Sequence, residues 1–336
     1  MARNRSGAPA SVKITDVATA AGVAPMTVSR VLNTPERVSG DTRARVQAVI
    51  ERMGYVPNLI AGGLSSRRSR MIAAIVPTIA SPMFSAPIQA FTDTLGTAGY
   101  RVMLALSGYG DGAEDELIRA VLSRRPDGLL LTGANHTPPV RRLLANASIP
   151  VVEIWDASTQ PTDMLVGFDH EEVGAAVASY FAALGHTRFA AMMASDPRAS
   201  ARAAGFARRV AELGFPLVAS RVGHAPSGIA DGRRGLREIA PQLTGRTAIF
   251  CSSDLVAFGA ITEARKLGLA VPADIAICGF GDMELSRETD PPFTTVSVDG
   301  AEVGRVAAEH LLARLRGETP PSRRLVPFRI LPRTSS

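Results

Sequence analysis

The chain has 336 residues, enough for one small and one large two-lobed domain, and its apolar fraction of 46% can supply a buried core. Its two cysteines, Cys251 and Cys278, lie in apolar stretches, so neither a disulfide framework nor a zinc site is expected. We find neither a membrane-spanning apolar run nor the apolar stretch of a signal peptide, so we expect a cytoplasmic protein with no membrane partner.

The net charge of +6 is concentrated at the amino end of the chain. Residues 1–70 contain eleven basic and four acidic residues, a net charge of +7, and the remaining 266 residues carry about −1. A compact basic unit attached to a near-neutral body is typical of nucleic-acid-binding proteins. Composition alone leaves a solvated basic tail as the alternative.

Three short helices are predicted within residues 12–55. The first ends at Gly22, a helix breaker, the second begins with Pro25 at its first position, and the third closes at Gly54. Two short helices joined by a tight turn match the helix-turn-helix design, in which the second helix enters the major groove of DNA. A generic three-helix bundle is the alternative.

From residue 71 the pattern changes to short apolar, β-branched runs that alternate with amphipathic helical stretches. This alternation predicts βαβ units and parallel sheets, which bind ligands beyond the carboxyl ends of their strands. The predicted strands span residues 71–76, 101–106, 128–132, 150–155, 165–168, 188–193, 247–251 and 275–280.

Several short motifs follow one another along the whole chain. They occupy residues 14–18, 21–23, 27–33, 38–39, 54–58, 184–186, 251–254, 271–272, 279–280 and 291–296. Together they resemble the LacI family of repressors, and the stretch from Leu131 to Asp169 resembles the gluconate-operon repressors within that family. The resemblance implies a small all-α helix-turn-helix domain followed by a two-lobed α/β domain with parallel sheets, similar to periplasmic binding proteins.

The resemblance also implies how the chain is divided. We expect a flexible tail at 1–11, the helix-turn-helix domain at 12–57, a hinge helix and linker at 58–70, and an effector-binding and dimerisation domain at 71–336. The lobes of this last domain should span about 71–169 and 171–297, with a C-terminal segment that returns to both.

The implied partners are a palindromic DNA operator and a small-molecule effector, with a sugar acid favoured over a neutral or phosphorylated sugar. The chain should form a homodimer, and a tetramer is not excluded. We expect no cofactor, metal or catalytic residue, because the chain lacks the GxxxxGK[ST], GxSxG and HExxH motifs. A sugar-transport receptor is the other alternative, and residues 12–64 argue against it.

The second helix should present side chains from Pro25 to Arg30 to DNA. Arg30 suits a guanine edge or a phosphate, and Met26 suits either a thymine methyl group or the packing of the helices. Ala24 and Lys13 stand where relatives carry hydroxyl caps, each worth roughly 1 kcal/mol. The expected DNA-binding residues are Pro25, Met26, Thr27, Ser29, Arg30, Asn33, Tyr55, Asn58 and Leu64.

Residues 58–64 match the hinge helix of the family, in which a leucine at the position of Leu64 wedges into the minor groove. Gly62 and Gly63 each cost such a helix about 1 kcal/mol relative to alanine, and so short a helix is unstable alone in water. We therefore expect the hinge to fold on specific DNA, with a plain flexible linker as the alternative.

The effector should lie between the lobes. Arg202 matches the effector-binding arginine of the family and its guanidinium suits a carboxylate, although a surface arginine is the alternative. His136 could donate to the effector or be solvated, and Trp155 could wall the pocket or belong to the core. The expected effector-binding residues are Ser81, Phe84, Tyr109, His136, Asp156, Asp169, Arg202 and Asp254.

Overall fold

The computed structural model describes residues 12–56, 69–79, 81–110 and 112–336. The chain forms two compact units, Met1–Ser69 and Arg70–Ser336. Asn58 and Leu64 lie outside the described residues, as do the predicted tail and most of the predicted hinge.

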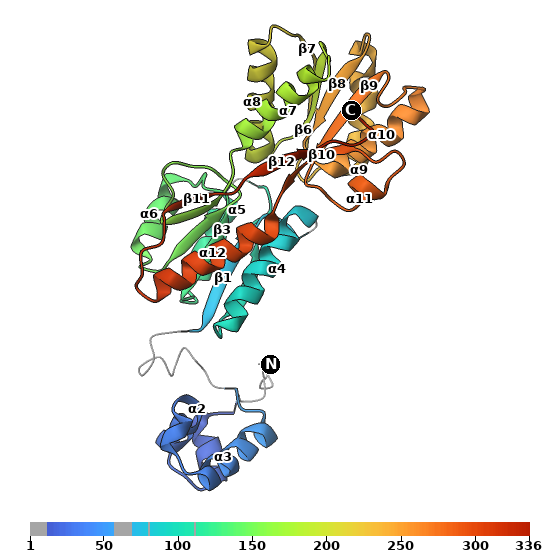
Figure 1. Ribbon diagram of the computed structural model, residues 1–336. Helices are drawn as coiled ribbons and strands as arrows, with labels where there is room; N and C mark the ends of the chain where they lie inside the picture. Colours follow the sequence, from blue (N-terminus) through green and yellow to red (C-terminus); the bar gives the residue numbers. More distant parts are fainter. Residues whose placement is uncertain (1–11, 57–68, 80, 111) are drawn as a thin grey trace, which may run out of the picture. The chain divides into compact units, whose positions relative to one another are not determined.

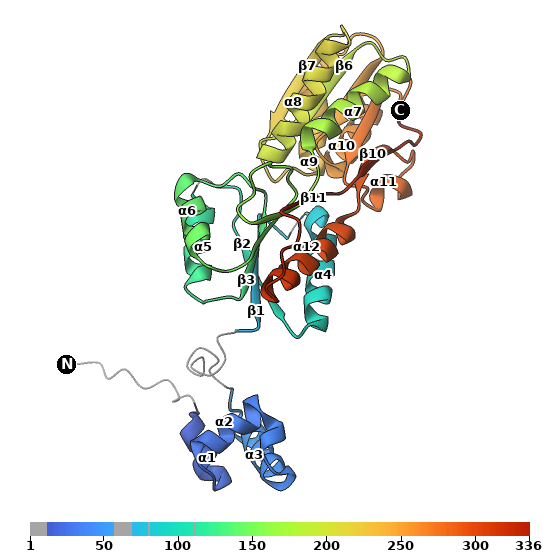
Figure 2. The ribbon, with the colours of Figure 1, turned by 60° about the vertical axis from the view of Figure 1, so that its left-hand side comes forward.

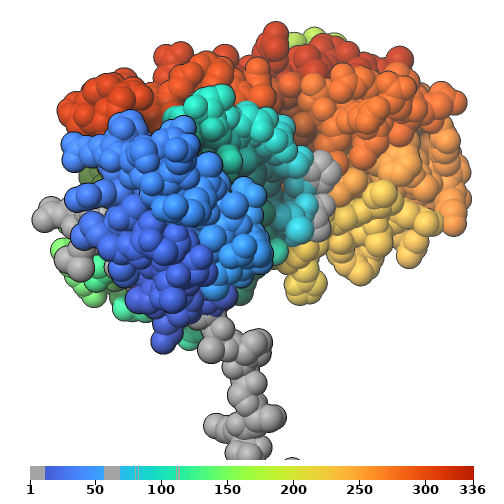
Figure 3. Space-filling model, turned by 90° about the horizontal axis from the view of Figure 1, so that it is seen from below, coloured from blue at the N-terminus to red at the C-terminus, as the bar shows by residue number. Residues whose placement is uncertain are grey.

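The described residues of the first unit form a bundle of three helices around a small core (blue in Figure 3). Gly22 and Gly54 end the first and third helices at φ 64° and φ 60°, a left-handed conformation that glycine adopts without strain. The core consists of Val17, Ala18, Ala21, Val28, Val31, Val46 and Val49. The helices are α1 (Ile14–Ala21), α2 (Pro25–Asn33) and α3 (Gly40–Met53), with a 3-10 turn η1 (Pro35–Arg37) between the last two.

The second unit consists of two lobes, each built on a six-stranded sheet covered by helices on both faces (Figure 1). The strand orders are β11-β5-β4-β3-β1-β2 in the first lobe and β12-β10-β9-β8-β6-β7 in the second. All neighbouring strands pair in parallel except β10 and β12. The predicted α/β lobes with parallel sheets are therefore confirmed.

In the first lobe, helices α4 and α12 pack on one face of the sheet, and α5 and α6 pack on the other. Its strands are β1 (Met71–Val76), β2 (Arg101–Leu106), β3 (Gly128–Thr132), β4 (Val151–Ile154), β5 (Met164–Gly167) and β11 (Arg323–Leu325). Its helices are α4 (Pro82–Thr97), α5 (Ala113–Leu122), α6 (Pro138–Asn146) and α12 (Gly300–Leu315).

In the second lobe, α7 and α8 lie side by side on one face (Figure 2), and α9 and α10 cover the other. Its strands are β6 (Phe189–Ala194), β7 (Leu217–Gly223), β8 (Thr247–Cys251), β9 (Ile275–Phe280), β10 (Thr294–Val298) and β12 (Phe328–Leu331). Its helices are α7 (His170–Ala183), α8 (Pro197–Glu212), α9 (Ile229–Ile239), the 3-10 turn η2 (Ala240–Gln242), α10 (Asp254–Leu267) and α11 (Leu285–Glu288).

The chain crosses between the lobes three times, after β5, after β10 and after β11. The first crossing leads directly into α7, whose contact with α8 is unusually close. A Cβ atom on Gly174 of α7 would lie 2.0 Å from the carbonyl oxygen of Arg202, and one on Gly205 of α8 would lie 2.0 Å from that of Glu171. These two glycines let α8 approach the crossing, and they bring Arg202 beside the interlobe cleft.

Candidate functional site

One face of α2 is free to meet a partner. Val28 and Val31 turn inward, while Pro25, Met26 and Arg30 are exposed on the other side. Met26 is 63% exposed, so the alternative that it packs between the helices does not hold. Helix α2 therefore presents Pro25 and Met26 from its first turn and Arg30 from its last turn outward, as a DNA-reading helix would.

The remaining predicted residues of this unit occupy its flanks. Thr27 and Ser29 are half-buried, and the exposed Asn33 donates from Nδ2 to the Ser29 carbonyl oxygen at 3.0 Å. Tyr55 packs partly against the helical core. Ala24 provides no side-chain cap to α2, but its carbonyl oxygen accepts from the Thr27 N–H at 2.8 Å. Because Pro25 has no N–H, the Met26 amide is the one at this end that is left for water or a phosphate.

A cavity of about 370 Å³ lies between the lobes of the second unit. Four of the predicted effector residues line it: Ser81, Phe84 and Tyr109 from the first lobe, and Arg202 from the second. Its volume lies within the range of small-molecule sites. The other lining residues are Met83, Ala194, Asp196, Arg198, Ala225, Pro226, Ser227, Gly228, Asp231, Ser252, Ser253, Leu255 and Met283.

The Arg202 side chain is a buried cation held by neutral groups. It is 3% exposed, and it donates from Nη1 to Nδ1 of His170 at 2.9 Å and from Nη2 to the Ser252 carbonyl oxygen at 3.0 Å. Its guanidinium carbon lies 4.1 Å from the ring centre of Phe280. Burial lowers the pKa of Arg202 to about 10, so the group stays charged at neutral pH.

Two buried polar atoms at this cavity lack a hydrogen-bond partner among the described residues. They are Nε of Arg202 and Oγ of Ser252, and both residues line the cavity. Buried polar groups without partners are uncommon because each loses its hydration. Both atoms are therefore suited to a polar ligand.

Arg198 is a second cation at the cavity, which the sequence analysis did not identify. It stands four residues before Arg202 on α8, yet its guanidinium carbon lies 5.5 Å from the ring centre of Phe84 in the other lobe. It also hydrogen-bonds Tyr109, whose pKa burial raises. From the sequence Arg198 looks like any helix-surface arginine, and only the packing of the lobes brings it into the cleft.

Asp156 and Asp169 line a neighbouring hollow and not this cavity. Asp156 accepts from the backbone N–H groups of Ala134, Ala157 and Ser158. Asp169 caps α7 by accepting from the backbone N–H groups of Glu171 and Glu172. Both carboxylates thus accept hydrogen bonds from the backbone, and neither lines the interlobe cavity.

Asp254 lies beneath the cavity and has no exposed surface. Its Oδ1 accepts from the Thr295 hydroxyl at 2.5 Å and its Oδ2 accepts from the Met283 N–H at 2.7 Å. Burial raises its pKa to about 6. In this structure Asp254 joins β10 to α10 and does not face the ligand space.

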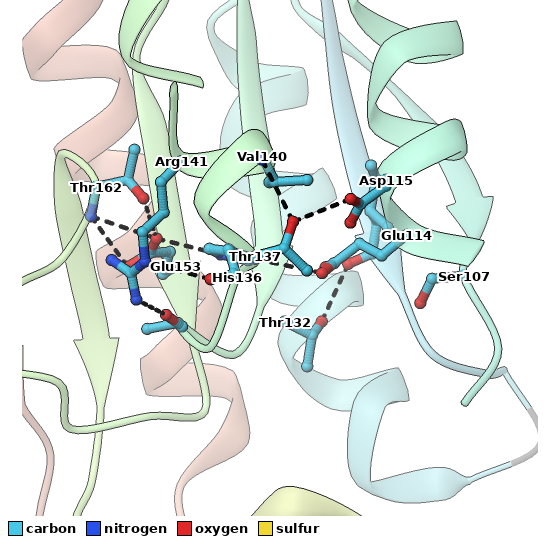
Figure 4. A network of polar contacts seen from close by, with 12 residues as sticks. Ser107, Glu114, Asp115, Thr132, His136, Thr137, Val140, Arg141, Glu153 and Thr162 are labelled. Atoms are coloured by element: carbon cyan, nitrogen blue, oxygen red, sulfur yellow. Dashed lines mark hydrogen bonds and ion pairs between the residues drawn. The ribbon is translucent and has the colours of Figure 1, made fainter. Parts of the chain in front are cut away.

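His136 is neither in the cavity nor solvated, although these were the two interpretations of it (Figure 4). It is buried in the first lobe, where Nδ1 lies 3.2 Å from Glu114 and Nε2 lies 3.2 Å from Glu153. Burial alone lowers its pKa, but the two glutamates outweigh this effect and raise it to about 9. Trp155 is likewise buried in the core and does not line the cavity.

The described residues contain neither a metal-binding cluster nor a membrane-spanning helix. No group of three or more His, Cys, Asp or Glu side chains among them could hold a metal ion. None of their helices combines the length and apolar character needed to cross a bilayer.

Comparisons with known proteins match separate stretches of the chain. Residues 13–58 match the family described as bacterial regulatory proteins, lacI family, and residues 178–336 match a periplasmic binding protein-like domain. The HTH-type transcriptional regulator GntR of Escherichia coli K12 is 35% identical over 90% of this chain and 92% of its own length.

Two solved structures extend this similarity to the fold. A LacI-family transcriptional regulator from Silicibacter pomeroyi is 30% identical, with a TM-score of 0.90 over 96% of this chain and 99% of the other. The lac repressor dimer bound to operator and the anti-inducer ONPF is 26% identical, with a TM-score of 0.82 over 97% and 99%.

Proposed function

Because this chain belongs to the LacI family of DNA-binding transcriptional regulators, we propose that it is a repressor whose operator affinity is controlled by a sugar acid, such as gluconate, in the interlobe cavity. The E. coli regulator GntR, to which it is 35% identical, supports the assignment to the gluconate-operon branch.

The buried charge of Arg202 carries this proposal. No carboxylate of the described residues forms an ion pair with it, and its contacts are an imidazole nitrogen, a carbonyl oxygen and an aromatic ring. A buried cation without an ion-pair partner is costly, and an anion that enters the cavity would relieve this cost. A carboxylate fits because Nε of Arg202, which lacks a partner among the described residues, can donate a charge-assisted hydrogen bond to it.

The rest of the cavity suits the hydroxylated chain of such an acid. Oγ of Ser252 can bond a hydroxyl group, and Ser81, Ser227 and Ser253 add further polar groups around the same space. Phe84 and other apolar side chains that line the cavity would cover the carbon chain. Arg198, whose Nε lies 3.8 Å from Asp196, adds a second guanidinium at the cavity, and this observation favours a phosphorylated sugar acid as the second candidate.

Isothermal titration calorimetry tests the ligand class. D-Gluconate should bind the native chain, whereas D-glucitol, which has the same hydroxylated chain without the carboxylate, should bind far more weakly. Arg202→Ala should weaken gluconate binding at least about 10-fold, because hydrogen bonds to charged groups contribute most to such sites. Arg208→Ala is the matched control, since Arg208 is exposed on the same helix and does not line the cavity. Equal binding of acid and polyol would reject the proposal, and preference for 6-phosphogluconate would favour the second candidate.

The DNA-binding part of the proposal concerns a homodimer on a palindromic operator. Edge strands β2 and β7 expose Leu104, Leu106 and Val222, which a second copy of the chain could cover. Sedimentation equilibrium should then give twice the chain mass of 35.3 kDa, and Leu106→Glu should lower it. Operators selected by the native protein from random duplexes should show two-fold symmetry, and gluconate should release them.

A further inference from the structure

We propose that His170 is a positioning residue: it holds the Arg202 guanidinium in the orientation that receives the acid group of the ligand. This inference rests on the proposed function, since it concerns the same cavity. His170 is the first residue of α7, directly after the chain crosses from the first lobe to the second. It touches one group from each lobe.

The two contacts of His170 fix its tautomer. Nε2 lies 3.1 Å from the Trp155 carbonyl oxygen, which can only accept, so Nε2 carries the proton. Nδ1 is then a bare acceptor, and Nη1 of Arg202 donates to it at 2.9 Å. An imidazole protonated at both nitrogens would lose this bond and place two cations side by side.

The surroundings keep His170 in this neutral form. Burial and the charge of Arg202 hold the pKa of His170 well below its usual range. Its ring packs against Phe168, with ring centres 4.5 Å apart, and Phe168 packs in turn against Phe280. Because Phe280 also lies against the guanidinium, Arg202 is fixed by one aromatic face and two acceptors.

The acceptor on the first lobe is itself held in an unusual backbone conformation. Trp155 has a φ of 61°, in the left-handed region that residues other than glycine seldom adopt. Its carbonyl meets Nε2 of His170, so a segment of the first lobe sets the ring that orients an arginine of the second. With Nη1 and Nη2 occupied in this way, Nε of Arg202 is the guanidinium nitrogen without a partner among the described residues.

A second buried histidine shows what a purely packing role looks like. His186 follows α7 and packs edge-on against Phe181 at 5.5 Å. Neither of its ring nitrogens has a hydrogen-bond partner in the part of the chain that the structure describes. His186 does not line the cavity, which makes it a matched control for the loss of a buried imidazole.

Two conservative substitutions separate the two contacts of His170. An Asn amide can place its oxygen near the position of Nδ1, so His170→Asn keeps the acceptor for Arg202 and loses the Trp155 contact. A Gln amide reaches the position of Nε2, so His170→Gln keeps the Trp155 contact and removes the acceptor. In calorimetry with D-gluconate, we expect His170→Asn to bind within about threefold of the native chain and His170→Gln to bind about 10- to 100-fold more weakly. His186→Asn should bind as the native chain does. Equal affinities for the two His170 variants, or the reverse order, would overturn the proposal.

A ligand-free measurement keeps this test independent of the proposed effector. The five histidines can be labelled with ¹⁵N, and the signal lost in His170→Asn should be a neutral imidazole protonated at Nε2 that does not titrate between about pH 5.5 and 8.5. The Nε–H resonance of Arg202, assigned with Arg202→Lys, should move in His170→Gln and stay in place in His170→Asn and His186→Asn. A titrating His170, protonation at Nδ1, or an unmoved Arg202 resonance would refute the positioning role. If the native chain binds no sugar acid, the proposed function fails, and these spectra still decide the role of His170.

Discussion

The charge of His136 should make the stability of the first lobe depend on pH, and the substitution His136→Asn tests this. The imidazole lies between Glu114 and Glu153, and Glu153 has no exposed surface and accepts a further hydrogen bond from the Thr162 hydroxyl. The glutamates raise the pKa of His136 to about 9, against about 6.5 in an unfolded chain. The protonated form is therefore favoured by folding.

The direction and size of the effect follow from these two pKa values. Because the pKa is raised by folding, the stabilisation is fully present below about pH 6.5 and is lost as the pH rises through about 9. The difference corresponds to about 3 kcal/mol of unfolding free energy. In His136→Asn this contribution is absent at every pH, so the native chain and the variant should differ most at pH 6.5 and should converge near pH 9.5.

Urea unfolding of the full chain gives the measurement. Trp155 is the single tryptophan, it is buried in the first lobe, and its fluorescence reports the unfolding of that lobe. His224→Asn is the control, because His224 is exposed. A difference between the native chain and His136→Asn that stays constant from pH 6.5 to 9.5 would show that the glutamates do not hold a charged imidazole.

Three further predictions concern other parts of the chain. Gly174→Ala should destabilise the chain by about 1–3 kcal/mol in urea unfolding, because its Cβ would meet the Arg202 carbonyl, whereas Gly96→Ala in α4 meets no atom within 4 Å and should be neutral or stabilising. Arg30→Ala should weaken operator binding by about 1–3 kcal/mol in fluorescence anisotropy, and an unchanged affinity would remove Arg30 from the DNA interface. Since burial raises the pKa of Asp254 to about 6, its contribution to stability is present below about pH 4 and is lost as the pH rises through 6. In Asp254→Asn the melting temperature should therefore change less with pH over this range. Melting temperatures that change with pH equally in the variant and the native chain would contradict this.

The sequence by itself determined the features that depend on residues adjacent along the chain. The ends of α1 and α3 follow from Gly22 and Gly54, since glycine adopts the left-handed conformation that ends a helix without strain. The eight predicted strands are apolar runs, and the structure contains a strand at each of them. Strands β7, β10, β11 and β12 were not predicted from the sequence. β11 is fully exposed and β7 is a half-exposed edge, so their pairing partners and not their own composition make them strands.

Only the tertiary structure decided which residues line the cavity. Arg202 could be identified from its motif, but Arg198 reaches the cleft only because the other lobe places Phe84 and Tyr109 against it. His136 resembles a loop histidine until folding brings in Glu114, 22 residues away along the chain. Electrostatic contacts and burial depend on distance in space. Because the chain crosses three times between two sheets, it brings together residues that are far apart in the sequence, and the sequence alone does not show that they are neighbours.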